Sequence, residues 1–215
     1  PDHWHALQTI HACQAGKDVY VEKPLSLMVD EGRHMVRAAR RYGRIVQTGS
    51  MQRSDDKFRL ACELVRSGRI GKIHTVRVGL PHVNFDVEPV QDSEPPPELD
   101  YEMWLGPARW RPYNKNRVHY NFRFYWDYSG GQMTNWGAHH LDIAQWGLDR
   151  DNSGPRTIDG KAVFDEKGRY EVPRESEIVY QYGDDVKVFC SQGAGRKSGT
   201  EFFGTKGSIY VDRGK

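Results

Sequence analysis

The tripeptide Glu22-Lys23-Pro24 is the first grouping in the chain whose residue types could do chemistry, and it follows the short β-type run Val19-Tyr20-Val21. A lysine at the carboxyl end of a parallel strand points into the ligand crevice of an α/β sheet. There its amine could polarise a hydroxyl or carbonyl oxygen, and nearby positive charge or partial desolvation would lower its pKa for that task. For the tripeptide alone, a surface lysine in an ordinary salt bridge is the simpler interpretation.

Three polar residues, Asn135, His139 and Asp142, stand at positions i, i+4 and i+7 of an expected helix, so they share one helical face. His139 could take a hydroxyl proton. Asp142, one turn further on, could orient the ring and stabilise its charge. A solvated helix face explains the same spacing, and the residues alone do not decide between the two interpretations.

Between positions 101 and 128, four arginines are interspersed among ten aromatic residues. Aromatic faces and arginine forks suit a sugar, which offers C–H faces and many hydroxyls. An interface between domains or subunits favours the same residue types, and both roles can coexist. The aromatics are Tyr101, Trp104, Trp110, Tyr113, Tyr120, Phe122, Phe124, Tyr125, Trp126 and Tyr128, and the arginines are Arg109, Arg111, Arg117 and Arg123.

We expect no metal site. His3 and His5 are two residues apart, and His139 and His140 are adjacent, so the members of the second pair point about 100° apart on a helix and do not chelate together. The three cysteines are far apart and form no CxxC pair, which argues against a zinc ribbon or a disulfide framework.

The elements that must position these residues alternate at the start of the chain. We expect helices over residues 4–15 and 29–42 and short strands over 19–21 and 45–46, the order typical of parallel α/β units. A helix over 56–67 and a half-buried strand over 73–80 follow.

The second half of the sequence changes character. Residues 81–128 predict irregular structure, partly because of Pro95-Pro96-Pro97, and residues 133–148 predict one strong helix. Two hairpins follow, with strands over 178–182 and 186–190 and over 201–203 and 208–211. We therefore expect an α/β protein with domains over 1–53 and 54–215.

Charge and hydropathy exclude several partners. The chain has 31 basic and 29 acidic residues, which are interspersed, so we expect no nucleic-acid partner. No apolar run approaches the roughly 20 residues of a membrane span, so we expect no membrane partner.

Several motifs together resemble the glucose-fructose oxidoreductase, inositol dehydrogenase and MocA family of NAD(P)-dependent oxidoreductases. The run from Gly16 to Pro24 resembles its lysine motif, and Pro1-Asp2-His3-Trp4-His5 resembles its turn after the fourth Rossmann strand. Gly130-Gly131 with Asn135, Gly137, His139 and Asp142 resembles its second motif, and the run from Phe203 to Ile209 resembles a late hairpin. These matches fall in family order along nearly the whole chain.

The resemblance implies a C-terminal remnant of a Rossmann-like parallel sheet, followed by an α+β domain with an open, mostly antiparallel sheet. It implies NAD or NADP as cofactor, a sugar or polyol substrate, and a homo-oligomer formed through the antiparallel sheet. By analogy Lys23 is the catalytic lysine and His139 the proton-transfer residue, with Asn135 and Asp142 beside them. The family usually has aspartate at the position of Asn135, and asparagine cannot accept a proton, so His139 must carry more of that role.

The remaining site residues follow from the same resemblance. We expect cofactor contacts from Pro1, Asp2, His5, Glu22, Lys23 and Pro24. We expect substrate contacts from Arg53, Arg123, Trp126 and His140.

The leading functional interpretation is hydride transfer between a nicotinamide and a secondary alcohol of a sugar or polyol. A related one is NAD-dependent cleavage or epimerisation of a glycoside. From another class, a non-catalytic sugar-binding or assembly module stays open for the 215-residue chain alone, although we expect the parent protein to be an enzyme. A cytoplasmic location is favoured, and export stays open because we expect the true N-terminus to lie upstream.

The chain contains no G-x-G-x-x-G turn of the kind that anchors a dinucleotide pyrophosphate, and we expect it to be trimmed at both ends. We therefore predict that the 215-residue chain binds a nicotinamide cofactor very weakly, because its main anchor is missing. Calorimetric titration with NAD measures this directly, and micromolar binding would contradict it.

Overall fold

The computed structural model describes residues 1–214, which divide into two compact units. Unit 1 comprises Pro1–Gly49, Asp86–Asn135 and Lys167–Val172, and unit 2 comprises the other described residues, Ser50–Phe85, Trp136–Glu166 and 173–214. Neither unit is contiguous in sequence, whereas the sequence predicts domains over 1–53 and 54–215. That boundary stays a prediction for the domains of the whole protein.

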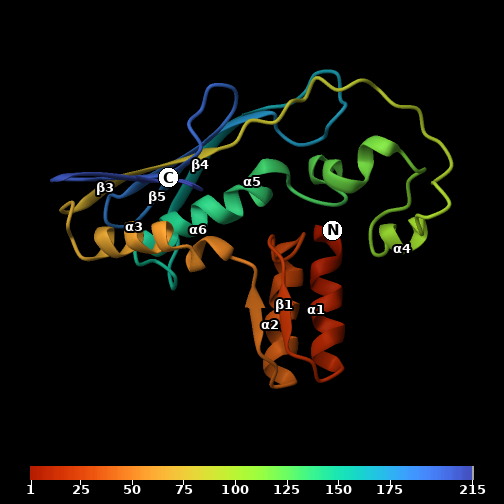
Figure 1. Ribbon diagram of the computed structural model, residues 1–215, viewed down its shortest axis with the longest axis horizontal. Coiled ribbons are helices and arrows are strands. Elements are labelled where there is room, and N and C mark those ends of the chain that lie inside the picture. Colours follow the sequence, from red (N-terminus) through yellow and green to blue (C-terminus); the bar gives the residue numbers. More distant parts are fainter. Residues whose placement is uncertain (215) are drawn as a thin grey trace. The chain divides into compact units, whose positions relative to one another are not determined.

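Unit 1 begins with alternating helices and strands (Figure 1). Its elements are a 3-10 helix over Asp2–Trp4, α1 (His5–Gln14), β1 (Val19–Val21), α2 (Val29–Arg41), β2 (Val46–Thr48), α4 (Tyr101–Leu105), 3-10 helices over Lys115–Arg117 and His119–Phe124, and α5 (Gly131–Asn135).

The two strands of unit 1 pair in parallel, with Val19 opposite Val46 and Val21 opposite Thr48. The side chains of Ala6, Val21 and Met35 form a small buried core between α1, β1 and α2. Because both strands run in the same direction, their carboxyl ends meet at one edge, where open α/β sheets bind ligands.

The aromatic-rich segment belongs to unit 1 because it packs on the start of the chain. The ring of His3 lies against Trp104 and Tyr128, with centroid distances of 5.4 and 5.2 Å. The indole N–H of Trp4 donates to the backbone oxygen of Trp104 at 3.1 Å. Gly106 has φ +48°, and a Cβ there would lie 2.1 Å from the Trp4 ring, so this turn requires glycine.

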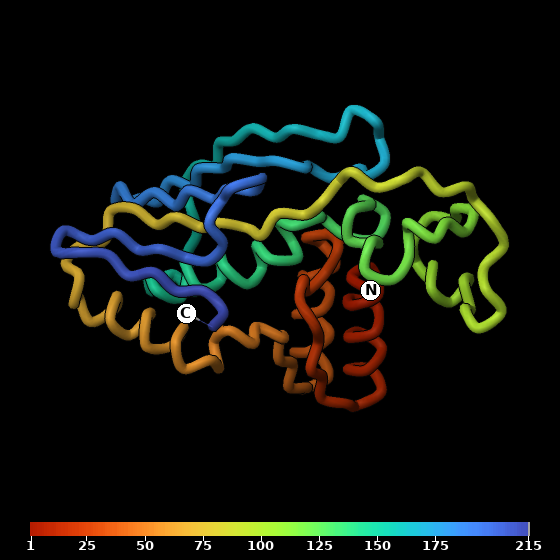
Figure 2. The backbone as a smooth tube through the Cα atoms, turned by 45° about the horizontal axis from the view of Figure 1, so that its top comes forward, coloured from red at the N-terminus to blue at the C-terminus, as the bar shows by residue number. Residues whose placement is uncertain are grey.

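Unit 2 is a six-stranded sheet with two helices. Its elements are a 3-10 helix over Met51–Ser54, α3 (Asp56–Arg66), β3 (Ile73–Leu80), α6 (Gly137–Gly147), β4 (Thr157–Val163), β5 (Glu175–Gln181), β6 (Lys187–Gln192), β7 (Gly199–Gly204) and β8 (Gly207–Val211). The strand order is β4-β5-β6-β3-β7-β8, and only the pair β3–β6 is parallel. The hairpins β4–β5 and β7–β8 therefore form opposite edges of the sheet (Figure 2).

The helices α3 and α6 pack on the sheet and cover one of its faces (Figure 1). Along β3, Val76, Val78 and Leu80 are buried at 0–1% exposure, and Phe202 of β7 is also buried. The residue between them, Arg77, is exposed on the other face. This alternation is the period of two that places one face of a strand in the core.

The fold class predicted from the sequence is confirmed. The parallel pair, the strand over 73–80, both hairpins and the helices α1, α2 and α3 lie where the sequence places them, within a few residues. The helix predicted over 133–148 is divided into α5 and α6 at Trp136. The strand β4 was not predicted, because all seven of its residues are exposed and its pattern shows no buried face.

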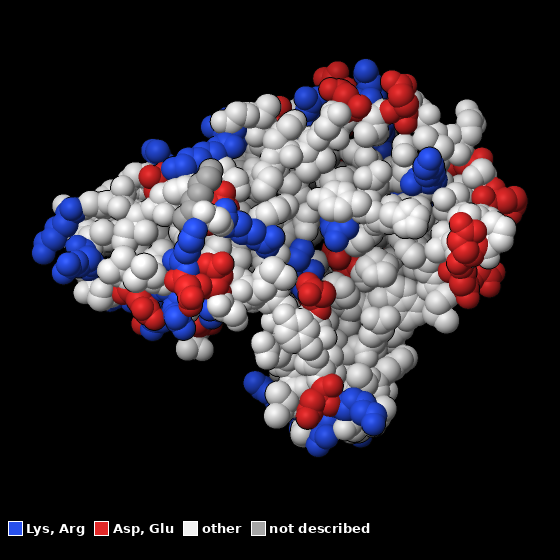
Figure 3. Space-filling view, in the orientation of Figure 1, with Lys and Arg blue, Asp and Glu red and all other residues white. Residues whose placement is uncertain are grey.

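Acidic and basic side chains lie next to each other over the face seen in Figure 3. Within residues 1–214, none of the helices has the length and apolar character needed to cross a membrane.

Candidate active site

Lys23 follows the carboxyl end of β1 and is half-buried. Its ammonium group donates a hydrogen bond of 2.7 Å to Oδ1 of Asn135 and one of 3.2 Å to the backbone oxygen of the same residue. The Lys23–Pro24 peptide bond is cis. Two residues that are 112 positions apart in sequence thus meet in unit 1, and both belong to the predicted catalytic set.

Asn135 is the last residue of α5 and is 7% exposed. Its Nδ2 donates to Oε1 of Gln132 at 3.1 Å, three residues earlier on the same helix. Both ends of the Asn135 amide therefore have a partner. The interpretation of Asn135 as part of a solvated helix face is contradicted by this burial.

Asp2 ties the chain start to the beginning of α5. Its carboxylate accepts a short hydrogen bond from Oγ of Ser129. That oxygen lies 3.3 Å from Oγ1 of Thr134, which in turn accepts from the backbone N–H of Gly130 at 3.1 Å. Burial raises the pKa of Asp2, while the Ser129 hydrogen bond opposes that shift.

The residues predicted to contact a cofactor gather around the Lys23 turn. Nδ1 of His5 lies 2.6 Å from the backbone oxygen of Pro24, which joins the start of α1 to this turn. Glu22 is exposed, and its carboxylate accepts from the backbone N–H of Lys23 at 3.3 Å. Pro1 is also exposed. Contact of these residues with a cofactor stays a prediction.

Asp142 of α6 is bound by Arg53 within unit 2. The guanidinium donates to both carboxylate oxygens of Asp142 at 2.8 Å and to those of Asp151 at 3.1 and 2.8 Å. It also lies over the ring of Trp146, 5.5 Å from the centroid. The hydrogen bonds with Asp142 and Asp151 raise the pKa of Arg53. Arg53 was expected to contact substrate, and Asp142 was expected to orient the ring of His139. In the structure the two side chains bind each other, so each expected contact would compete with this ion pair.

The two histidines of α6 are both buried. His139 is 5% exposed, with its ring 6.1 Å from that of Trp136, so its side chain does not face bulk water. His140 has no exposed surface, and its Nε2 lies 3.5 Å from Oγ of Ser198 and 3.8 Å from a carboxylate oxygen of Asp212. Burial lowers the pKa of His140 to about 4, although Asp212 opposes the shift. Contact of His140 with substrate stays a prediction, and the complete burial of its side chain argues against that contact.

Arg123 and Trp126 lie in the aromatic-rich segment of unit 1. The Arg123 guanidinium lies over the rings of Tyr120 and Phe122, 4.6 Å from each centroid. Trp126 is 50% exposed, and its backbone N–H donates to Glu171 at 2.9 Å. An exposed indole and a stacked guanidinium suit a sugar face, and the role of both in substrate binding stays a prediction.

Gln132 and Ser129 were not singled out from the sequence. Ser129 contacts Asp2, which is far away in the sequence, and Gln132 meets Asn135 only because α5 begins at Gly131. No local sequence pattern indicates either contact. Among residues 1–214, no cluster of three or more His, Cys, Asp or Glu side chains has the geometry to hold a metal ion.

Two family models match the chain. Residues 1–50 match the NAD-binding Rossmann fold of the GFO/IDH/MocA oxidoreductase family, and residues 81–213 match the C-terminal alpha/beta domain of the same family.

Curated proteins match along the whole chain. The myo-inositol 2-dehydrogenase of Thermotoga maritima is 34% identical over 213 residues, which cover 97% of this chain and 53% of that protein. The uncharacterized oxidoreductase YrbE of Bacillus subtilis is 31% identical over 216 residues, with coverage of 98% and 53%. The chain therefore spans about half the length of these relatives.

Solved structures share the fold. The aldose-aldose oxidoreductase from Caulobacter crescentus superimposes with a TM-score of 0.72 at 21% identity, covering 99% of this chain and 54% of that one. The WlbA dehydrogenase from Bordetella pertussis, in complex with NADH and UDP-GlcNAcA, gives a TM-score of 0.70 at 18% identity, covering 98% and 56%. At these identities the likeness concerns the fold alone.

The burial of His140 predicts a pH dependence of stability. Its folded pKa of about 4 lies below the ordinary value of 6.5, so the neutral ring is favoured in the folded state. The stabilisation is fully present above pH 6.5 and is lost as the pH falls through 4, by up to about 3 kcal/mol. In thermal unfolding from pH 7 to 4, His140→Asn should flatten the dependence of Tm on pH, whatever its effect at pH 7. The control is His82→Asn, which removes an exposed histidine for which no ion pair is seen among residues 1–214, and it should change the slope much less; equal slopes for all three proteins would contradict the prediction.

Proposed function

Since this chain belongs to the GFO/IDH/MocA family of oxidoreductases, we propose that the full-length protein transfers a hydride between a nicotinamide cofactor and a secondary alcohol of a sugar or polyol. The observation that carries the proposal is the ammonium group of Lys23, held by Asn135 at the carboxyl end of a parallel strand. The inositol dehydrogenase relative of Thermotoga maritima supports the class of substrate.

The residues at this edge fit a nicotinamide cofactor. Gly49, which follows β2, is buried, and a Cβ there would lie 3.1 Å from the carboxylate of Glu22, so the glycine lets that carboxylate lie close to the end of β2. Glu22 and Lys23 would hold the nicotinamide end. The bound cofactor would supply the hydride acceptor or donor.

The chemistry assigned to the chain itself is proton handling. Lys23 donates hydrogen bonds, so its ammonium can polarise a carbonyl oxygen or stabilise an alkoxide as charge develops on it. Asn135 accepts the Lys23 hydrogen bond but cannot take a proton. We assign that step to His139, whose imidazole can take a hydroxyl proton.

The same residues would serve redox-assisted cleavage or epimerisation of a glycoside. The two reactions differ in the fate of the reduced cofactor, which accumulates in net oxidation and is recycled in cleavage. Absorbance of the reduced nicotinamide during turnover, together with product identification, separates them.

We predict that Lys23→Ala lowers kcat of the full-length protein by on the order of 100-fold or more, because a positioned electrostatic group is lost. Binding of the sugar or polyol should change less. Lys17→Ala removes an exposed lysine of the same unit and should have little effect. His139→Ala should also lower kcat. Steady-state kinetics with cofactor and a panel of polyols measures these effects, and near-normal turnover of Lys23→Ala would make the lysine merely structural.

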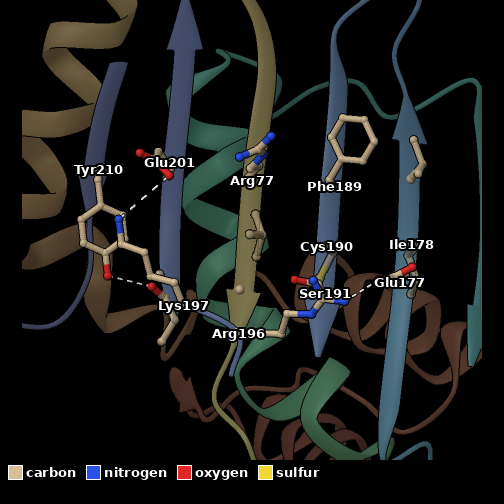
Figure 4. Close-up of a pocket in the computed structure, with 15 residues that line it drawn as sticks. Arg77, Glu177, Ile178, Phe189, Cys190, Ser191, Arg196, Lys197, Glu201 and Tyr210 are labelled. Atoms are coloured by element: carbon tan, nitrogen blue, oxygen red, sulfur yellow. Dashed lines mark hydrogen bonds and ion pairs between the residues drawn. The ribbon is translucent and has the colours of Figure 1, made fainter. Parts of the chain in front are cut away.

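We also propose that the uncovered sheet face of unit 2 joins two copies of this chain in a homo-oligomer. This face carries a hollow of about 620 Å³, lined across β5, β6, β3, β7 and β8 (Figure 4). Phe189 is 39% exposed there beside Arg77, and the hairpin β4–β5 adds the exposed Val163, which the strand register places on the same face. A face that combines apolar groups with charges of both signs can meet a copy of itself about a two-fold axis.

Phe189→Glu should therefore dissociate the oligomer, because it replaces an apolar ring of this face with a carboxylate that the contact would bury. Sedimentation velocity of the full-length protein measures the change. Trp110→Glu is the matched control, since Trp110 is an exposed aromatic residue of unit 1. A wild-type protein that is monomeric, or an oligomer that Phe189→Glu leaves intact, would contradict the proposal.

A further inference from the structure

We propose that Gln132 is a positioning residue for Lys23 and acts through the side-chain amide of Asn135. The proposal rests on the proposed function, since it assigns a second residue to the control of the same lysine. Gln132 is 2% exposed in α5, and its Oε1 accepts the hydrogen bond from Nδ2 of Asn135 at 3.1 Å. Oδ1 of Asn135 in turn accepts from Nζ of Lys23 at 2.7 Å.

The direction of this chain of hydrogen bonds is set at Lys23. An ammonium group has three donors and no acceptor, so Asn135 must present its oxygen to Nζ. The amide nitrogen of Asn135 then points the other way and requires an acceptor, which is the side-chain oxygen of Gln132. If that acceptor is lost, the Asn135 amide can rotate by about 180° and place its N–H₂ group against the ammonium, where two donors face each other.

The need for an orienting residue follows from the asparagine. An aspartate has two equivalent carboxylate oxygens, and either one accepts from Lys23 without an orienting partner. An amide has one oxygen and one nitrogen, so its orientation must be fixed by a neighbour. Gln132 supplies this at i−3 on the same helix, where side chains meet.

Charged groups also surround Lys23 and must be considered in any pH measurement. The buried carboxylate of Asp2 is attracted electrostatically by Lys23, His5 and Arg123. The carboxylate of Glu22 lies on the adjacent residue. The Gln132–Asn135 pair contributes dipoles and no net charge, so Gln132→Met disturbs the orientation of Asn135 without adding a charge beside Lys23.

The decisive experiment compares Gln132→Met in two backgrounds of the full-length protein. With Asn135 present, we expect kcat to fall on the order of tenfold, since a hydrogen bond to a charged group is disturbed, with a change in KM below about twofold. With Asn135→Asp present, Gln132→Met should change kcat by less than about twofold, because the carboxylate needs no orienting partner. Such non-additivity is the signature of direct coupling between neighbours.

Two further variants separate positioning from folding. Gln132→Glu keeps an oxygen that accepts from Asn135 Nδ2 but adds a buried carboxylate, so it should retain more of kcat than Gln132→Met does. Gln47→Met makes the same side-chain change at an exposed position of β2 and should have no effect. An equal loss of kcat from Gln132→Met in both backgrounds, or no loss in either, would overturn the proposal.

A readout that does not depend on turnover distinguishes failure of this inference from failure of the proposed function. The ¹⁵Nζ resonance of Lys23 reports its pKa by NMR titration. Gln132→Met should lower that pKa, because the ammonium loses an accepting oxygen, and Asn135→Asp should raise it. If the wild type oxidises no polyol, the proposed function fails, but the pKa shifts of Lys23 still test the role of Gln132. An unchanged Lys23 pKa in Gln132→Met would refute that role.

Discussion

The ammonium group of Lys23 can only donate hydrogen bonds, so a half-buried lysine at the end of β1 requires oxygen atoms placed to receive it. The structure supplies two of them from Asn135, at 2.7 and 3.2 Å. Everything that fixes Asn135 therefore also fixes Lys23. The start of α5 is held by Ser129, which donates to the buried Asp2, and the geometry of the lysine thus depends on the first residues of the chain as well as on its own strand.

The aromatic-rich segment explains how such distant residues are kept in register. Trp104 and Tyr128 enclose His3, and the Trp4 indole fits against Gly106. Burial of these rings makes the segment part of unit 1 although it has little regular secondary structure. Ring packing therefore holds the segment that precedes α5 against the start of the chain, and the hydrogen bond from Ser129 to Asp2 joins the same two parts of unit 1.

The sequence predicts elements well where burial leaves a periodic trace and poorly where contacts join distant segments. The sequence predicts the strand over 73–80 correctly because the large apolar residues Val76, Val78 and Leu80 alternate with Arg77 and Gly79, and the three apolar side chains are buried. The sequence does not predict β4, because this edge strand pairs with β5 through its backbone and has no buried side chains that would leave a periodic apolar pattern. Lys23 and Asn135 were identified as candidates from their motifs, but their mutual hydrogen bond spans 112 positions and has no local pattern. The sequence does not predict the ion pairs of Arg53 with Asp142 and Asp151 either, because these residues are also far from Arg53 along the chain.

The two polar centres handle charge in opposite ways, and the difference bears on what each can do. In unit 2, Arg53 meets two carboxylates, an arrangement that fixes the geometry of its members through charge-assisted hydrogen bonds. In unit 1, Lys23 meets an amide, which fixes geometry while adding no charge that would hold the proton on the lysine. A carboxylate at position 135 would stabilise the ammonium against deprotonation. An amide partner therefore adds no charge of its own beside Lys23, and it accepts from the ammonium only while a neighbour keeps its oxygen turned toward it.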